Sequence, residues 1–123
     1  MSNFEDLKIL IVDNSKTMLR IIGNAVKQIG VEISKSAENG QEALELFRKE
    51  EFNVVLTDRN MPGMDGLTLV KEMRKLNKAV PIVMITTESG RTEVIKALKA
   101  GVSSYIVRPF EVKTLKEKLE DIL

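Results

Sequence analysis

The sequence predicts an α/β fold in which five parallel strands alternate with five helices. Short apolar runs rich in Val and Ile recur along the chain, and each is followed by a segment with the apolar spacing of a helix. This alternation requires a parallel sheet with right-handed crossovers. No linker, internal repeat or low-complexity segment interrupts the 123 residues, a length that suits one core. We therefore expect a single domain over residues 1–123.

The first strand is predicted at residues 7–12, an apolar run expected to be buried on both faces of the sheet. Ser15 is a candidate N-cap for the following helix, which should end at Gly30. The apolar residues on one side of this helix are Met18, Ile21, Ile22, Ala25, Val26 and Ile29.

The second strand is predicted at residues 31–35. Apolar and polar residues alternate there, which is typical of a half-exposed strand at the edge of a sheet. The next helix is expected to begin at Asn39-Gly40. Its inward-facing residues would be Ala43, Leu44 and Phe47.

The third strand is predicted at residues 54–57 and leads directly into Asp58. Open α/β sheets bind their ligands at the carboxyl ends of their strands, so Asp58 is the first candidate for function. A loop containing Pro62 follows, and Asp65 is the expected N-cap of the third helix. This helix would bury Leu67, Val70 and Met73.

The fourth strand is predicted at residues 82–85 and ends in Thr86, and the fifth at residues 105–107 ends at Arg108. The helix between them should end at Gly101. The apolar positions of the last two helices are Val94, Ile95 and Leu98 in one and Val112, Leu115, Leu119 and Ile122 in the other.

The alternating second strand is an edge, whereas the first, third and fourth look covered on both faces. This favours the flavodoxin-like strand order 2-1-3-4-5, whose ligand crevice lies between strands one and three. Asp13 and Asp58 end those two strands and should be neighbours. Thr86 and Arg108 end strands four and five at the same edge.

Composition excludes several classes of function. Nineteen Lys and Arg balance eighteen Asp and Glu, so no net field attracts nucleic acid or a membrane. The absence of His excludes Ser-His-Asp catalysis, the common zinc sites and a phosphohistidine carrier. Cys is also absent, which permits a cytoplasmic location, and we find neither a signal peptide nor an apolar run of membrane length.

The four polar strand ends suit phosphoryl chemistry. Two neighbouring carboxylates need a cation, and oxygen donors favour Mg²⁺. A carboxylate beside such an ion can act as nucleophile toward a phosphoryl group, with Thr86 and Arg108 binding its oxygens. Taken singly, Asp13 could instead be a turn former, Thr86 a hydroxyl that bonds the main chain, and Arg108 a surface charge. Their gathering at one edge favours function.

Together these residues resemble a family. The run of residues 10–13, Asp58 followed by Met61-Pro62, and then Thr86 and Arg108-Pro109 resemble the response-regulator receiver domains, most closely the single-domain chemotaxis receivers of the CheY type. The resemblance implies that Asp58 accepts a phosphoryl group from a histidine kinase or a small-molecule donor. It also implies that Mg²⁺ is held by Asp13, Asp58 and the main-chain carbonyl of Asn60.

The resemblance assigns further roles. Thr86 and Tyr105 match the family's switch pair, and Asn60 and Glu88 match positions that set the lifetime of the phosphoryl group. The Arg108–Pro109 peptide bond would be cis. A partner is expected on the surface of the fourth helix, fifth strand and fifth helix, where the candidate contacts are Tyr105, Glu93, Lys96 and Lys113.

Two residues depart from the family pattern. Asn14 stands where a second acidic residue is usual, so it would hold Mg²⁺ only weakly or through a water molecule. Arg108 stands where Lys is usual, and a guanidinium could clamp Asp58 as a bidentate ion pair.

The leading hypothesis is a monomeric, stand-alone phosphorylation switch in chemotaxis, acting on the flagellar motor, with a phosphorelay role as an alternative. Such a protein takes up and hydrolyses its own phosphoryl group and is not a turnover enzyme. A second hypothesis is a degenerate receiver that binds partners without phosphorylation, which Asn14 and Arg108 would favour. A small Asp-nucleophile phosphatase is a third, and a flavin-binding module has little support because few aromatic residues could stack on the ring.

Overall fold

The computed structural model describes residues 4–123, so the first three residues of the predicted domain lie outside the described part. Its centre is a five-stranded parallel sheet with the strand order β2-β1-β3-β4-β5, as predicted. The strands are β1 (Lys8–Val12), β2 (Ile33–Ala37), β3 (Val54–Thr57), β4 (Ile82–Thr86) and β5 (Ser104–Val107).

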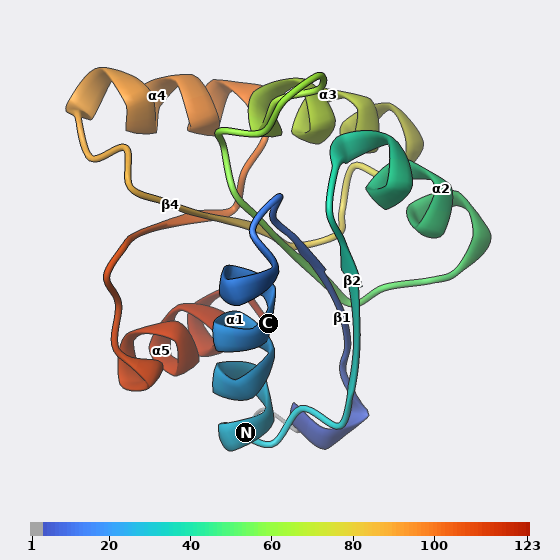
Figure 1. Cartoon of the computed structure of the whole chain (residues 1–123), viewed down its shortest axis with the longest axis vertical. Helices are drawn as coiled ribbons and strands as arrows, with labels where there is room; N and C mark the ends of the chain where they lie inside the picture. Colours follow the sequence, from blue (N-terminus) through green and yellow to red (C-terminus); the bar gives the residue numbers. More distant parts are fainter. Residues whose placement is uncertain (1–3) are drawn as a thin grey trace.

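Helices cover both faces of this sheet. A short 3-10 helix, η1 (Phe4–Asp6), precedes β1. The α-helices are α1 (Lys16–Gln28), α2 (Gly40–Lys49), α3 (Gly66–Leu76), α4 (Arg91–Ala100) and α5 (Val112–Ile122). Helices α1 and α5 lie on one face, and α2, α3 and α4 lie on the other (Figure 1). None of the helices in residues 4–123 is long and apolar enough to span a membrane.

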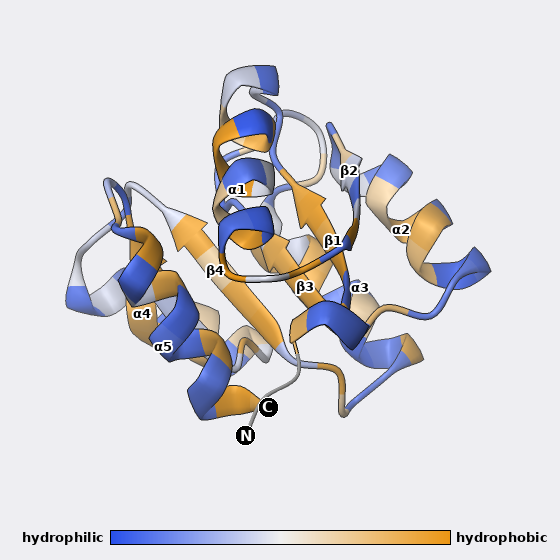
Figure 2. Cartoon of the chain, turned by 90° about the horizontal axis from the view of Figure 1, so that it is seen from below, coloured by the Kyte–Doolittle hydropathy of each residue, from blue (hydrophilic) through white to orange (hydrophobic). Residues whose placement is uncertain are grey.

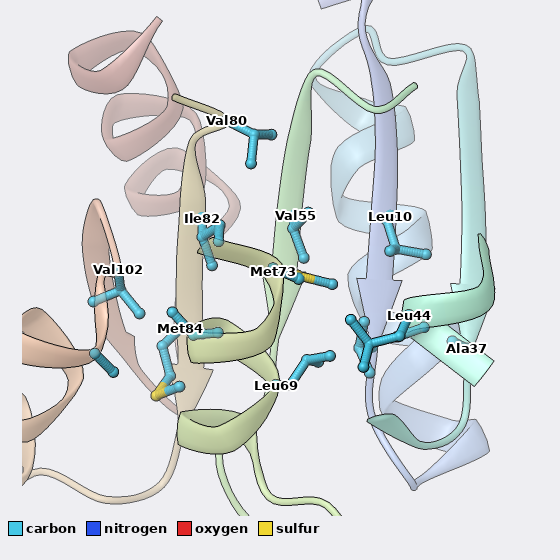
Figure 3. Packing of buried hydrophobic residues seen from close by; sticks show 14 of the residues in the cluster. Leu10, Ala37, Leu44, Val55, Leu69, Met73, Val80, Ile82, Met84 and Val102 are labelled. Atoms are coloured by element: carbon cyan, nitrogen blue, oxygen red, sulfur yellow. The ribbon is translucent and has the colours of Figure 1, made fainter. Parts of the chain in front are cut away.

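Each face of the sheet has its own hydrophobic core. Neighbouring residues of a strand point to opposite faces. In β1, Leu10 therefore packs in the core under α2, α3 and α4, whereas Ile9 and Ile11 pack in the core under α1 and α5. Figure 3 shows the first of these cores, where Leu69 and Met73 of α3 pack against the sheet. The apolar colouring of β1, β3 and β4 in Figure 2 follows from this burial on both faces.

Polar side chains cap three helices, at the predicted caps Ser15 and Asp65 and at the predicted helix start Asn39. Ser15, Asn39 and Asp65 each accept a hydrogen bond from a main-chain N–H in the first turn of α1, α2 and α3, respectively. Gly101 ends α4 with a φ of 122°, a conformation that favours glycine.

The predicted second strand was wrong in position. The strand runs over Ile33–Ala37, and only Ala37 is buried, whereas Ile33 is 53% exposed. Val31 is buried before the strand begins, in the core under α1 and α5. The apolar side chain of Val31 therefore belongs to the loop that leaves α1, and its alternation with Ile33 did not mark a buried face.

Three residues predicted to face the core are instead exposed: Ile21, Ile95 and Leu98. In α4 the buried residues are Ala97 and Ala100. This helix packs closely on its neighbours through small side chains, so its larger apolar residues point away from the sheet.

Candidate functional site

The carboxyl ends of the strands bring the four predicted polar residues to one edge of the sheet. Asp13 follows β1 and Asp58 follows β3, and the N–H of Asp58 donates to the carbonyl of Val12 at 3.0 Å. Thr86 ends β4, and its carbonyl accepts from the N–H of Arg108 at 2.8 Å. One bond thus places Asp58 beside the end of β1, the other places Arg108 beside Thr86, and the pairing of β3 with β4 joins the two pairs.

A guanidinium spans the two carboxylates. Arg108 Nη2 lies 3.1 Å from Asp58 Oδ1, and Nη1 lies 3.8 Å from Asp13 Oδ2. Asp13 and Asp58 are 1% and 5% exposed, so these ion pairs form largely out of contact with water. Arg108 therefore pairs with Asp58 as expected, but not as a bidentate clamp, because Nη2 contacts Asp58 while Nη1 is directed to Asp13.

The second oxygen of Asp13 lacks a hydrogen bond. Its Oδ1 accepts from the N–H of Ser15 at 2.9 Å, whereas Oδ2 is buried with no hydrogen-bond partner and only the more distant ion pair to Arg108. Burial raises the pKa of Asp13, the Ser15 N–H lowers it, the negative charge of Asp58 raises it, and Arg108 lowers it. The raised pKa means that the cations present do not fully compensate this carboxylate.

Asp58 is held by its neighbours in the chain. Its Oδ1 accepts from the main-chain N–H of Arg59 at 2.7 Å, in addition to the ion pair with Arg108. The main-chain carbonyl of Asp58 accepts from the Thr57 hydroxyl at 2.9 Å. These contacts fix the carboxylate at the edge of the sheet, next to the end of β1.

The donor set fits Mg²⁺ with water molecules completing its coordination. Residues 4–123 contain no cluster of three acidic, His or Cys side chains that could hold a metal ion alone. Asp13 and Asp58 nevertheless supply two carboxylates, and Mg²⁺ commonly binds one or two of them while keeping its waters. The unpartnered, buried Oδ2 of Asp13 is the atom that such a cation would satisfy. Asn14, the residue after Asp13, is exposed.

The side chains of Tyr105 and Thr86 both form hydrogen bonds with the main chain of Glu88. The Tyr105 hydroxyl donates to the Glu88 carbonyl at 2.6 Å, and its ring packs against the core under α2, α3 and α4. Thr86 Oγ1 accepts from the N–H of Glu88 at 3.3 Å. The Glu88 carboxylate accepts from the side-chain amide of Asn60 at 3.1 Å, which joins the two predicted lifetime residues. The peptide bond between Arg108 and Pro109 is cis, as expected.

Sequence reasoning did not find the partner of Arg59. The guanidinium of Arg59 pairs with Glu93 Oε2 in the first turn of α4, so Glu93 does not simply face solvent. Nothing in the sequence around Arg59 indicates this pairing, because the direction of a loop side chain depends on the loop geometry.

A buried carboxylate, a cation and a hydroxyl at the carboxyl edge of a 2-1-3-4-5 sheet define a domain suited to accept a phosphoryl group. A model of the response regulator receiver domain matches residues 9–120. The chain belongs to the response regulator receiver domain family.

Its relatives narrow this class. The chain is 52% identical to a chemotaxis protein CheY homolog of Campylobacter jejuni over 120 residues, which cover 95% of this chain and 92% of that protein. It is 53% identical to chemotaxis protein CheY1 of Helicobacter pylori strain J99, covering 95% and 97%. Among solved structures, that of chemotaxis protein CheY4 of Vibrio cholerae is similar, with a TM-score of 0.89, 32% identity and coverage of 95% and 98%.

Proposed function

We propose that this chain is a chemotaxis response regulator whose Asp58 accepts a phosphoryl group from a histidine kinase. The observation that carries the proposal is the buried Asp58 carboxylate, with the Arg108 guanidinium at 3.1 Å, beside the carboxylate of Asp13. The names of the relatives supply the chemotaxis context.

The transfer needs little from the protein beyond positioning and charge. An Asp58 carboxylate oxygen attacks the phosphorus of a phosphohistidine, the P–N bond breaks, and its electron pair stays on the imidazole. Arg108 and the Thr86 hydroxyl bind phosphoryl oxygens and keep the group oriented. Held by Asp13, Asp58 and the main-chain carbonyl of Asn60, Mg²⁺ would supply positive charge to the transferring group.

The signal then passes from the site to a protein surface. Thr86 moves to the phosphoryl group, and the ring of Tyr105 turns inward behind it. The surface of α4, β5 and α5, with Tyr105, Glu93, Lys96 and Lys113 as candidate contacts, changes its affinity for a partner such as the flagellar motor switch. Asn60 and Glu88 set how long the phosphoryl group survives hydrolysis, so the chain acts as a timed switch and not as a turnover enzyme. We place this monomeric switch in the cytoplasm.

The ion pair between Arg108 and Asp58 favours a second candidate function. A guanidinium that spans both carboxylates neutralises the charge that would attract Mg²⁺. If this pair does not open, the domain acts as a receiver that binds its partners without being phosphorylated.

Intact mass after incubation with acetyl phosphate and Mg²⁺ tests these proposals. We expect one phosphoryl adduct that requires Mg²⁺, disappears with excess chelator, and is absent from Asp58→Asn. An adduct that persists in Asp58→Asn would place the acceptor elsewhere.

The Arg108→Lys variant separates the two candidate functions. A single ammonium cannot bridge Asp13 and Asp58 as the fork does, so we expect Arg108→Lys to bind Mg²⁺ more tightly and to be phosphorylated faster. A natural chain that forms no adduct, together with an Arg108→Lys variant that does, would establish the phosphorylation-independent receiver. Mg²⁺ affinity from isothermal titration calorimetry gives a readout that does not depend on phosphorylation.

A further inference from the structure

Arg59 is a second cation beside the candidate phosphoryl site. Its ion-pair partner is Glu93 of α4 and not a carboxylate of the site. Its main-chain N–H donates to Asp58 Oδ1 at 2.7 Å, so its side chain starts at the acceptor itself. Its guanidinium pairs with Glu93 of α4, and the whole Arg59 side chain is only 15% exposed. A charged group that is largely buried at this position has a specific partner and is not a solvated surface residue.

The charge of Arg59 acts on the same hydroxyl as the charge of Asp58. Burial raises the pKa of Tyr105, the positive charge of Arg59 lowers it, and the negative charges of Glu88 and Asp58 raise it. The guanidinium therefore lies within electrostatic range of the group that joins the site to β5. It is close enough to the site for a new negative charge on Asp58 to attract it.

The pair with Glu93 anchors the first turn of α4. The buried residues of this helix, Ala97 and Ala100, both lie in its second half. Its N-cap, Gly90, provides no side-chain hydrogen bond. The other partner of Glu93 is Lys96 at 3.6 Å, which lies on α4 itself and cannot tie the helix to the rest of the domain.

We propose that Arg59 is a second phosphoryl-binding cation, which pairs with Glu93 as long as Asp58 is not phosphorylated. The proposal rests on phosphorylation of Asp58. A phosphoryl group carries about two negative charges, and guanidinium binds its oxygens through paired N–H groups. When the group forms, Arg59 leaves Glu93 for a phosphoryl oxygen, and the first turn of α4 loses its anchor to the loop after β3. The negative charge added at Asp58 would thereby loosen the N-terminal end of α4.

Hydrogen–deuterium exchange on the whole chain tests this coupling. The protein is incubated with acetyl phosphate and Mg²⁺, the adduct is quantified by intact mass, and exchange is followed in residues 90–96. We expect phosphorylation to speed exchange of the first turn of α4 by about fivefold or more, the lower end of usual coupling between two sites.

Two variants show whether Arg59 moves from Glu93 to the phosphoryl group or only forms a permanent structural ion pair with Glu93. Glu93→Gln frees Arg59, so the first turn of α4 should exchange fast before phosphorylation, and the adduct should decay more slowly than in the natural chain. Arg59→Gln should also exchange fast, but its adduct should decay faster because a phosphoryl-binding cation is lost. A structural pair would shift the two lifetimes in the same direction. Lys99→Gln, which removes one positive charge from an exposed position of the same helix, is the matched control and should behave like the natural chain.

The outcomes distinguish this proposal from the function on which it rests. An adduct without faster exchange in α4, or lifetimes that change in the same direction in Glu93→Gln and Arg59→Gln, would overturn the role of Arg59 and leave the phosphorylation of Asp58 intact. Failure of the natural chain and of Arg108→Lys to form any adduct would overturn both.

Discussion

Among single residues, Asp13 has a carboxylate whose charged form is disfavoured by its surroundings. Its carboxylate is buried, one oxygen lacks a hydrogen bond, and the pKa is raised above the ordinary value of 3.8, mainly by burial. The folded chain therefore holds this proton at pH values at which the unfolded chain has lost it. As a result, Asp13 reduces stability as pH rises from 3.8 through the folded pKa, and the cost persists at neutral pH.

We predict that Asp13→Asn raises the melting temperature of the metal-free protein at pH 7. The amide oxygen can keep the hydrogen bond from Ser15 without a buried charge. The gain should shrink as the pH is lowered toward 3.8, because the natural side chain then becomes neutral as well. Thermal unfolding in chelator across this pH range is the measurement. A gain that does not vary with pH would contradict the explanation, and Mg²⁺ affinity should fall in the same variant.

Sequence reasoning located Asp13, Asp58, Thr86 and Arg108 at one edge because parallel strands deliver their carboxyl ends there. It could not find the contact between Arg59 and Glu93. That pair joins the loop after β3 to a helix that begins 32 residues beyond Arg59, and no periodicity encodes the direction of a loop side chain. The roles assigned to the four edge residues remain predictions until the adduct is measured.

Among the elements, α3 begins in close contact with the loop that carries Asp58. A Cβ atom added at Gly66, the first residue of α3, would lie 2.2 Å from the carbonyl oxygen of Asp58 and 2.7 Å from Cα of Arg59. Both are main-chain atoms that cannot rotate away. The helix can begin here because glycine has no side chain, and the loop carrying the acceptor is pressed against its first turn.

We predict that Gly66→Ala costs about 1–3 kcal/mol of unfolding free energy, because the added methyl group must displace the backbone of the acceptor loop. Gly23→Ala is the matched control. Gly23 lies within α1, where a Cβ atom would meet nothing within 4 Å, so this variant should gain about 0.5–1 kcal/mol from better helix propensity. Urea unfolding of both variants is the measurement, and an unchanged Gly66→Ala would show that the loop is free to move.

The elements also show where apolar periodicity misleads. In α4 the spacing of Ile95 and Leu98 suggested the buried side, but both side chains are exposed and Ala97 and Ala100 face the sheet. Periodicity identifies a face that is apolar, whereas packing selects the face that fits closely against the neighbouring elements. Where small residues allow that fit, larger apolar ones remain on the surface.

At the scale of the whole molecule, one sheet separates two cores. We predict that Leu10→Ala and Ile11→Ala, which truncate neighbouring residues of β1 on opposite faces, each cost about 2–5 kcal/mol. Each variant should still unfold in a single transition, because both cores share the same central strand. Urea denaturation followed by circular dichroism and by NMR methyl signals tests this, and separate transitions for the two probes would show that the cores unfold independently.

The overall architecture could be predicted because it depends on repeated, local signals. Covered first, third and fourth strands and one alternating edge strand were enough to give the strand order. The position of β2 was missed because an exposed edge strand has little burial pattern of its own. Apolar patterns in the sequence locate strands whose side chains are buried, and they locate exposed strands much less well.

Tyr105 gives the molecule a built-in optical probe. It is the single tyrosine of a chain without tryptophan, and its hydroxyl bonds to the Glu88 carbonyl at 2.6 Å. Near-ultraviolet absorption and emission above the phenylalanine bands therefore come from one ring at the junction between the candidate site and β5. Any rearrangement that breaks this bond should change the spectrum of the unlabelled protein, so the kinetics of the switch can be followed with no dye and no engineered fluorophore.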